Sequence, residues 1–276
     1  MDRVGLGWRP EIASGIFARL DRIDVVEVMA DDYFDASARE VRALRTLVSQ
    51  VPVQLHGVSL GLASTSKADE RPLKKMARVL DAVRPESWSE HLAFVRGGGV
   101  EIGHLAAPPR TRSTIDGAAS NLVRATRVTG SRPLVENIAT LIDPPGSELD
   151  EGEWIRDILH ATNCDLLLDL HNLHANAVNF GFDAREFIDR LPADRIGAVH
   201  LAGGKWIGRL LDDHLHDVPD EVYALLERTA EHSNRPLTVI LERDGNFPPM
   251  NELLAQLDRA REALKAGRRA RELARV

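Results

Sequence analysis

Short apolar runs alternate with longer amphipathic stretches along the chain. Eight runs have the length and composition of buried strands: VGLG from residue 4, then residues 24–29, 51–56, 87–94, 133–137, 165–170, 196–201 and 236–242. Helical spacing follows at residues 11–20, 37–49, 69–83, 113–129, 151–162, 184–190, 217–232 and from 250 onward. Such alternation indicates a parallel sheet with crossover helices, and eight units predict an α/β fold of the (β/α)8 TIM barrel type.

The chain length agrees with one such domain. Barrels of this type typically have about 250 residues, and this chain has 276. We expect the barrel to occupy residues 1–262, with an Arg-rich helix end or tail at residues 263–276. A hydrophobic fraction of 43% and a charged fraction of 28% are typical of a globular protein with a sizeable core.

Charge and hydropathy argue against several classes of partner. The net charge of -7 argues against nucleic acid, because proteins that bind nucleic acids usually carry a basic surface. No run approaches 18 apolar residues, and the first residues lack the pattern of a signal peptide. We therefore expect a cytoplasmic protein without membrane association. The single cysteine, Cys164, precedes the apolar run LLLDL and is expected to be a buried structural thiol.

Potential metal ligands stand at the ends of most predicted strands, where TIM barrels place their active sites. The candidates on or after strands are His56, His91, Glu136, Asp169, Asn172, His200 and Glu242. Several carboxylates directed into one barrel mouth would repel one another unless a multivalent cation neutralised them. Their convergence therefore predicts a metal centre.

Two further candidates lie in the segment RLLDDHLHDVPDEV, after the seventh predicted strand. Asp212 and His214 are two residues apart and share one side of an extended segment, so we expect both to be ligands. His216 and Asp217 are either further ligands or the start of a helix. Four more polar residues are expected to support the ligands by hydrogen bonds or to add a ligand: Glu27, Asp31, Asn137 and His171.

The mixture of donors narrows the choice of metal. Neutral imidazole with carboxylates suits iron, manganese and zinc, whereas an all-oxygen set favours magnesium or calcium. The candidates exceed what one ion needs, so we expect two or three ions that share bridging carboxylates. Composition leaves open whether such a cluster is redox-active or hydrolytic.

Seven segments, in order along the chain, resemble one known family: VPVQLHGVSL, SEHLAF, LVEN, LLLDLHNLHANAVNFGFDA, VHLAG, LLDDH and LERDGNFP. This is DUF692, the multinuclear non-heme iron-dependent oxidative enzymes, and the resemblance runs from about residue 4 to about residue 260. It implies a barrel with two or three irons, mixed Fe(II)/Fe(III), that uses O2 to oxidise residues, often cysteine, in a ribosomally made precursor peptide. The family's ligand motifs fall on the seven candidates at the strand ends and also on Asp212 and His214.

The chain departs from the family pattern at three places. It has Asp31-Asp32 where the family commonly has Glu-Asn, and His171 where the family has Asn in Asp-x-Asn-Asn. The family also often has a Ser near the position of Gly61. We expect His171 to add or reposition a ligand, and a changed surrounding of the metal to alter the substrate or reaction without loss of iron.

Three functions follow from these observations. The leading one is a peptide-modifying iron oxidase, in which the metal cluster carries catalysis without a separate nucleophile. The alternative is a zinc- or manganese-dependent hydrolase or sugar isomerase, and the third is a non-catalytic peptide- or metal-binding protein. Because one barrel leaves no room for a peptide-recognition domain, we also expect a partner protein that captures the leader segment of the peptide.

Peptide contacts are the least defined part of the sequence. Five aromatic residues either line a peptide channel or pack in the core and loops: Trp8, Trp88, Trp206, Phe180 and Phe182. The segment GGKWIGR is expected to form part of a lid over the site.

Overall fold

Eight strands form a closed parallel barrel in a computed structural model that describes residues 1–274. Around the barrel the order is β1 (Arg3–Gly7), β12 (Thr238–Leu241), β9 (Ile196–Leu201), β8 (Asp165–Asp169), β7 (Leu134–Glu136), β4 (Ser87–His91), β3 (Val53–Gly57) and β2 (Val26–Met29). Each strand coincides with one of the eight predicted runs. The predicted TIM barrel is confirmed.

The barrel strands are buried along almost their whole length. Every residue of β3 and β12 is buried, and so are four of the five residues of β8. Strands covered on both faces have near-continuous apolar sequences rather than alternating ones. This explains why short apolar runs marked the strands, and why a polar residue at a strand end is conspicuous.

The chain forms two compact units, Glu27–Leu166 and Met1–Val26 with Leu167–Val276. The helices of the first unit are the 3-10 helix η3 (Asp31–Tyr33), α2 (Ala38–Val48), α3 (Glu70–Val83), α4 (Arg112–Thr129) and α5 (Glu151–Thr162). Local signals set their limits: Ser37 and Glu40 form a capping box on α2, and the Asp150 side chain accepts a hydrogen bond at the start of α5. Gly130 ends α4 with a left-handed φ of 80°.

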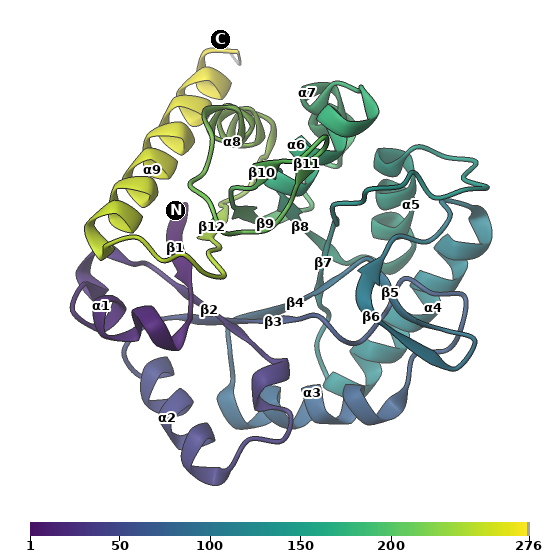
Figure 1. Ribbon diagram of the computed structural model, residues 1–276, viewed down its shortest axis with the longest axis horizontal. Helices are drawn as coiled ribbons and strands as arrows, with labels where there is room; N and C mark the ends of the chain where they lie inside the picture. Colours follow the sequence, from purple (N-terminus) through teal and green to yellow (C-terminus); the bar gives the residue numbers. More distant parts are fainter. Residues whose placement is uncertain (275–276) are drawn as a thin grey trace. The chain divides into compact units, whose positions relative to one another are not determined.

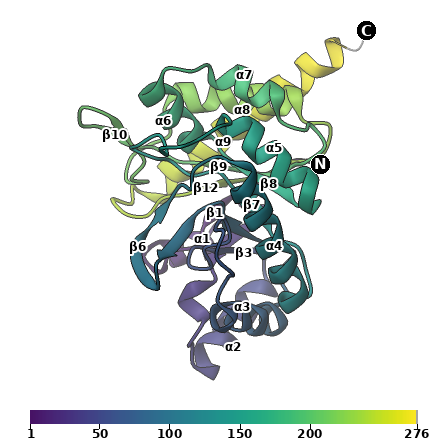
Figure 2. The same cartoon turned by 90° about the vertical axis from the view of Figure 1, so that its right-hand side faces the viewer.

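The second unit contains the remaining helices: η1 (Pro10–Ile12), α1 (Ala13–Phe17), η2 (Leu20–Arg22), α6 (Leu170–Phe180), α7 (Ala184–Arg190), α8 (Asp220–His232) and α9 (Met250–Leu273). Helices α8 and α9 lie side by side (Figures 1 and 2). Gly267 permits this close approach, because a Cβ there would lie 2.1 Å from the carbonyl oxygen of Glu227. Within residues 1–274, no helix is long and apolar enough to cross a membrane.

Four features differ from the expected elements. Helix α6 follows β8 directly and was not predicted. The strand predicted over residues 87–94 ends as β4 at His91, and Phe94 already begins a hairpin of β5 (Phe94–Gly97) and β6 (Val100–Ala106). The turn of this hairpin holds Gly98 and Gly99 at φ 58° and 82°. The segment GGKWIGR contributes to a second hairpin of β10 (Lys205–Trp206) and β11 (Leu210–Leu211). Helix α8 begins at Asp220, after Pro219, rather than at residue 217.

Cys164 is buried, as expected. Of the predicted aromatic residues, Trp88 is 1% exposed and packs in the core, whereas Trp206 is 63% exposed. Helix α9 continues without a break to Leu273 and buries Ala263 and Leu264. The last two residues of the predicted tail, 275–276, lie outside the described residues.

Candidate metal centre

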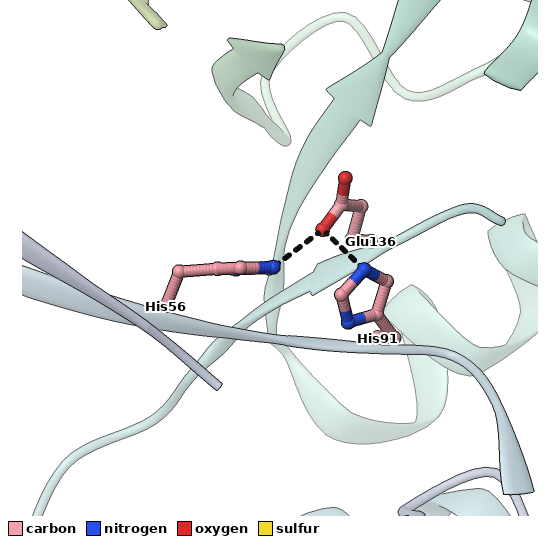
Figure 3. A group of neighbouring side chains, drawn as sticks. All are labelled: His56, His91 and Glu136. Atoms are coloured by element: carbon pink, nitrogen blue, oxygen red, sulfur yellow. Dashed lines mark ion pairs between the residues drawn. The ribbon is translucent and has the colours of Figure 1, made fainter. Parts of the chain in front are cut away.

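Three side chains from neighbouring strands converge in the first unit (Figure 3). His56 on β3 and His91 at the end of β4 each place Nε2 3.3 Å from Oε2 of Glu136, at the end of β7. The side chains are 3%, 12% and 1% exposed, respectively. We call these residues the histidine pair cluster. It offers two imidazole nitrogens and one carboxylate at a single point.

Contacts at Nδ1 of both histidine rings indicate that this cluster suits a cation. Nδ1 of His91 lies 3.2 Å from the carbonyl oxygen of Gly57, which only accepts, so Nδ1 carries the proton. In the neutral ring, the lone pair of His91 Nε2 then faces the Glu136 carboxylate. Nδ1 of His56 is likewise engaged, 2.7 Å from the Ser89 hydroxyl. A lone pair facing a carboxylate is repulsive unless a proton or metal ion lies between, so the donor set fits a metal.

A second group of ligand atoms lies in the other unit. Asp169 ends β8, His200 lies on β9 and Glu242 follows β12, and one ligand atom of each lies within 4.8 Å of the others. His200 Nδ1 is 3.1 Å from Glu242 Oε2 and 4.0 Å from Asp169 Oδ2. All three residues are buried. Two carboxylates and one imidazole withdrawn from water form a second donor set suited to a divalent or trivalent cation.

The segment after β11 adds Asp212 and His214 to this group. His214 Nδ1 lies 3.3 Å from Glu242 Oε2, and its Nε2 lies 2.9 Å from Asp212 Oδ1. We call the resulting group of five residues the carboxylate cluster: Asp169, His200, Asp212, His214 and Glu242. His214 adopts a left-handed φ of 54°, which turns the chain sharply at this point.

The charges of Asp212 and His214 depend on each other. Burial disfavours the Asp212 carboxylate, but hydrogen bonds from His171 and His214 outweigh it and hold the pKa of this carboxyl far below its ordinary value. Burial also opposes the charged form of His214, yet hydrogen bonds to Asp212 and Asp244 raise its pKa well above its ordinary value. Because a histidine must lose its proton to bind a metal, an ion would take the place of this proton.

Most of the other predicted residues are buried. Asn172 lies in the first turn of α6, where its backbone N–H donates to Asp169 Oδ1 over 2.6 Å. Glu27 and Asn137 are buried, and Asp31 Oδ2 accepts a hydrogen bond from the backbone N–H of Val58. His171 Nδ1 lies 2.6 Å from Asp212 Oδ1.

His216 and Asp217 were expected either to bind metal or to begin a helix. His216 contacts the neighbouring Asp213, with Nδ1 2.9 Å from Oδ1. Asp217 accepts hydrogen bonds from Arg243 and Gln256. The helix-start interpretation is wrong, because α8 begins only after Pro219.

Two acidic residues near the clusters were not anticipated. Glu90 is 1% exposed and accepts hydrogen bonds from the backbone N–H groups of His91 and Leu60, while burial raises its pKa despite the opposing effect of His91. Asp244 Oδ2 lies 3.5 Å from His214 Nδ1, and its other oxygen pairs with Arg9. Sequence signals existed, since Glu90 adjoins His91 in SEHL and Asp244 follows Glu242 by two residues.

Comparisons with known proteins agree with the sequence resemblance. The family described as RiPP precursor modification enzyme MbnB/TglH/ChrH matches residues 3–265. A UPF0276 protein of Streptomyces avermitilis is 42% identical over 276 residues, and the match covers 96% of this chain but only 56% of that longer protein. A UPF0276 protein of Chromobacterium violaceum is 32% identical over 262 residues, with 94% of each chain covered.

Solved structures agree with the fold. The structure of an L-ribulose 3-epimerase aligns with a TM-score of 0.65 over 100% of this chain and 99% of that one, at 16% identity. At this identity the likeness concerns the barrel alone. The family match, by contrast, spans nearly the whole chain and includes every strand that carries a cluster residue. The protein thus belongs to the family of RiPP precursor modification enzymes MbnB/TglH/ChrH.

Proposed function

We propose that this protein is an O2-dependent oxidase with two or three non-heme irons that modifies residues, cysteine in particular, of a ribosomally made precursor peptide. The observation that carries the proposal is the presence of two clusters of imidazoles and carboxylates in a chain of this family. His56, His91 and Glu136 would hold one ion. The carboxylate cluster, with Asn172 beside Asp169, would hold the remaining one or two irons. Mixed-valent iron would supply the redox chemistry with O2.

The protein's own residues prepare these sites. The Gly57 carbonyl and the Ser89 hydroxyl engage Nδ1 of His91 and His56, which leaves Nε2 of each ring for a ligand. Buried carboxylates offset the charge of the ions, and burial keeps bulk water away from both clusters. We further propose that a separate partner protein holds the leader segment of the peptide.

The β10–β11 hairpin is the part of the chain that we propose to contact the peptide. Trp206 and Ile207 near its turn are 63% and 62% exposed, although large apolar side chains of this kind are usually covered. Four residues after Ile207 the hairpin ends, and Asp212 of the carboxylate cluster follows. Trp206 and Ile207 are thus only a few residues from Asp212 in sequence, and we propose that they contact a peptide bound at that cluster.

Analysis of protein purified without oxygen tests the proposed activity. We expect two to three irons per chain, a Mössbauer spectrum of mixed valence, and O2-dependent modification of a precursor peptide encoded beside the gene. Zinc or manganese alone, with turnover independent of O2, would favour the hydrolase or isomerase instead. Peptide binding without any turnover, undiminished in a His91→Ala variant, would favour the non-catalytic alternative.

Replacing Trp206 by alanine is expected to raise KM for the precursor peptide about tenfold and to leave kcat nearly unchanged, because exposed aromatic anchors contribute binding energy without touching the reacting atoms. Steady-state O2 consumption measures both constants. Val123→Ala provides the control, since Val123 on α4 is 61% exposed and outside the hairpin. An unchanged KM would remove the hairpin from the proposed peptide site.

A further inference from the structure

The amide side chain of Asn179 on helix α6 bonds the backbone of the β10–β11 hairpin. Asn179 Nδ2 donates to the backbone carbonyl of Leu210, and Asn179 Oδ1 accepts from the N–H of the same residue, both over 2.9 Å. The guanidinium carbon of Arg209 lies 5.7 Å from the centre of the Phe180 ring. Both figures show α6 beside this hairpin (Figures 1 and 2). Because both polar groups of one hairpin residue are bonded, the hairpin cannot slip along the helix without losing two hydrogen bonds.

A second contact joins the first turn of α6 to the residue that follows the hairpin. His171 is fully buried, and its Nδ1 lies 2.6 Å from Asp212 Oδ1. The same oxygen lies 2.9 Å from Nε2 of His214. One carboxylate oxygen thus lies between an imidazole on a rigid helix and an imidazole of the carboxylate cluster. A hydrogen bond from His171 restricts the rotation of the Asp212 carboxylate and, through it, the position of the His214 ring.

The chain entering the hairpin is shaped around His171. A Cβ at Gly204 would lie 2.5 Å from Cε1 of the His171 ring and 1.8 Å from the carbonyl oxygen of Leu211. Only glycine therefore lets the chain ahead of β10 pass so close to the ring and to β11. His171 Nε2 is buried and has no hydrogen-bond partner among residues 1–274, and Nδ1 is the nitrogen that contacts Asp212. This is also the position at which the sequence departs from the Asn of the family pattern.

We propose that His171 and Asn179 are positioning residues that preset Asp212 and His214 for metal binding. Asn179 fixes the hairpin on α6, and His171 orients the carboxylate of Asp212, which directly follows the hairpin. The inference rests on the proposed metal-binding role of the carboxylate cluster. It gives α6 a structural role at the site, although Asn172 in its first turn is the only metal ligand that we predict on this helix.

Cobalt(II) titration of metal-free protein tests the role of His171. We expect His171→Leu to weaken cobalt binding to one of two sites about 10–100-fold, the usual effect of losing an outer hydrogen bond to a ligand, and to change the visible absorption bands of that site. The site formed by the histidine pair cluster should keep its affinity. His171→Asn should restore both affinity and spectrum, because its amide N–H takes nearly the place of Nδ1–H.

His174→Leu is the matched control. His174 lies one turn further along α6 and is half-buried. Its ring packs near that of His171, with the ring centroids 6.4 Å apart, so its replacement perturbs the same packing without removing the contact between His171 and Asp212. Its replacement should leave both cobalt sites unchanged. If His174→Leu and His171→Leu lowered the cobalt affinity equally, the effect would belong to helix packing and the positioning role would be refuted.

Hydrogen exchange of the metal-free protein tests Asn179 independently of any metal. Asn179→Leu should abolish the protection of the Leu210 amide and accelerate exchange over residues 205–217, while α8 and α9 keep their protection. Unchanged exchange in Asn179→Leu, together with unchanged cobalt affinity in His171→Leu, would overturn the inference. If wild-type protein bound no cobalt, the proposed function would fail instead, and the exchange result would still decide whether α6 holds the hairpin.

Discussion

Replacing His91 by alanine is expected to remove about one metal ion per chain and to lower the rate of peptide oxidation more than about a hundredfold. His91 Nε2 is one of two imidazole nitrogens that face Glu136 Oε2, and an alanine leaves only His56 and the carboxylate. Loss of an outer hydrogen-bond partner alone typically reduces metal affinity or activity about 10–100-fold, so loss of a ligand should exceed that range. Metal analysis and single-turnover assays measure the two effects separately.

His104→Ala is the control for this experiment, because His104 lies on the exposed strand β6. It should keep the full metal content and rate. A His91→Gln variant helps to separate chemistry from folding, since glutamine fills much of the space of the ring but binds metal weakly. If His91→Ala kept its full complement of metal, the histidine pair cluster would not be a metal site.

Removal of metal by a chelator is expected to lower Tm by about 10 °C. A ligand present at a thousand times its Kd stabilises the folded state by about 4 kcal/mol, and 1 kcal/mol corresponds to about 2–4 °C in a protein of this size. The physical reason lies in the carboxylate cluster, where Asp169 and Glu242 both approach His200 Nδ1 in a buried site. Without a cation these carboxylates keep the cost of burial and lose the compensating charge.

Differential scanning calorimetry with and without chelator measures this shift. Re-addition of Fe(II) without oxygen should restore Tm. In His91→Ala the chelator should cause a smaller shift, because one ion is already absent. Equal Tm values for wild-type protein before and after chelation would mean that neither cluster binds metal tightly in the folded state.

The hydrophobic pattern was sufficient to predict the barrel. Each strand is a short buried run, and its burial follows from its own composition, as in the wholly buried β12. Helix α6 escaped prediction for two physical reasons. Asp169 ends β8 and also caps α6, so no loop announces the helix. Its buried residues mix polar side chains, His171, Asn172 and Asn176, with apolar ones, so no continuous apolar stripe marks the helix.

The sequence by itself determined which residue types stand at which strand ends, because parallel strands deliver their last residues to one end of a barrel. Only the tertiary structure decided how those residues group. Register and loop path place Oε2 of Glu242 beside both His200 and His214, and Oδ1 of Asp212 beside both His171 and His214. Spacing along a chain cannot specify such shared atoms, since they depend on the relative placement of strands, helix α6 and a hairpin far apart in sequence.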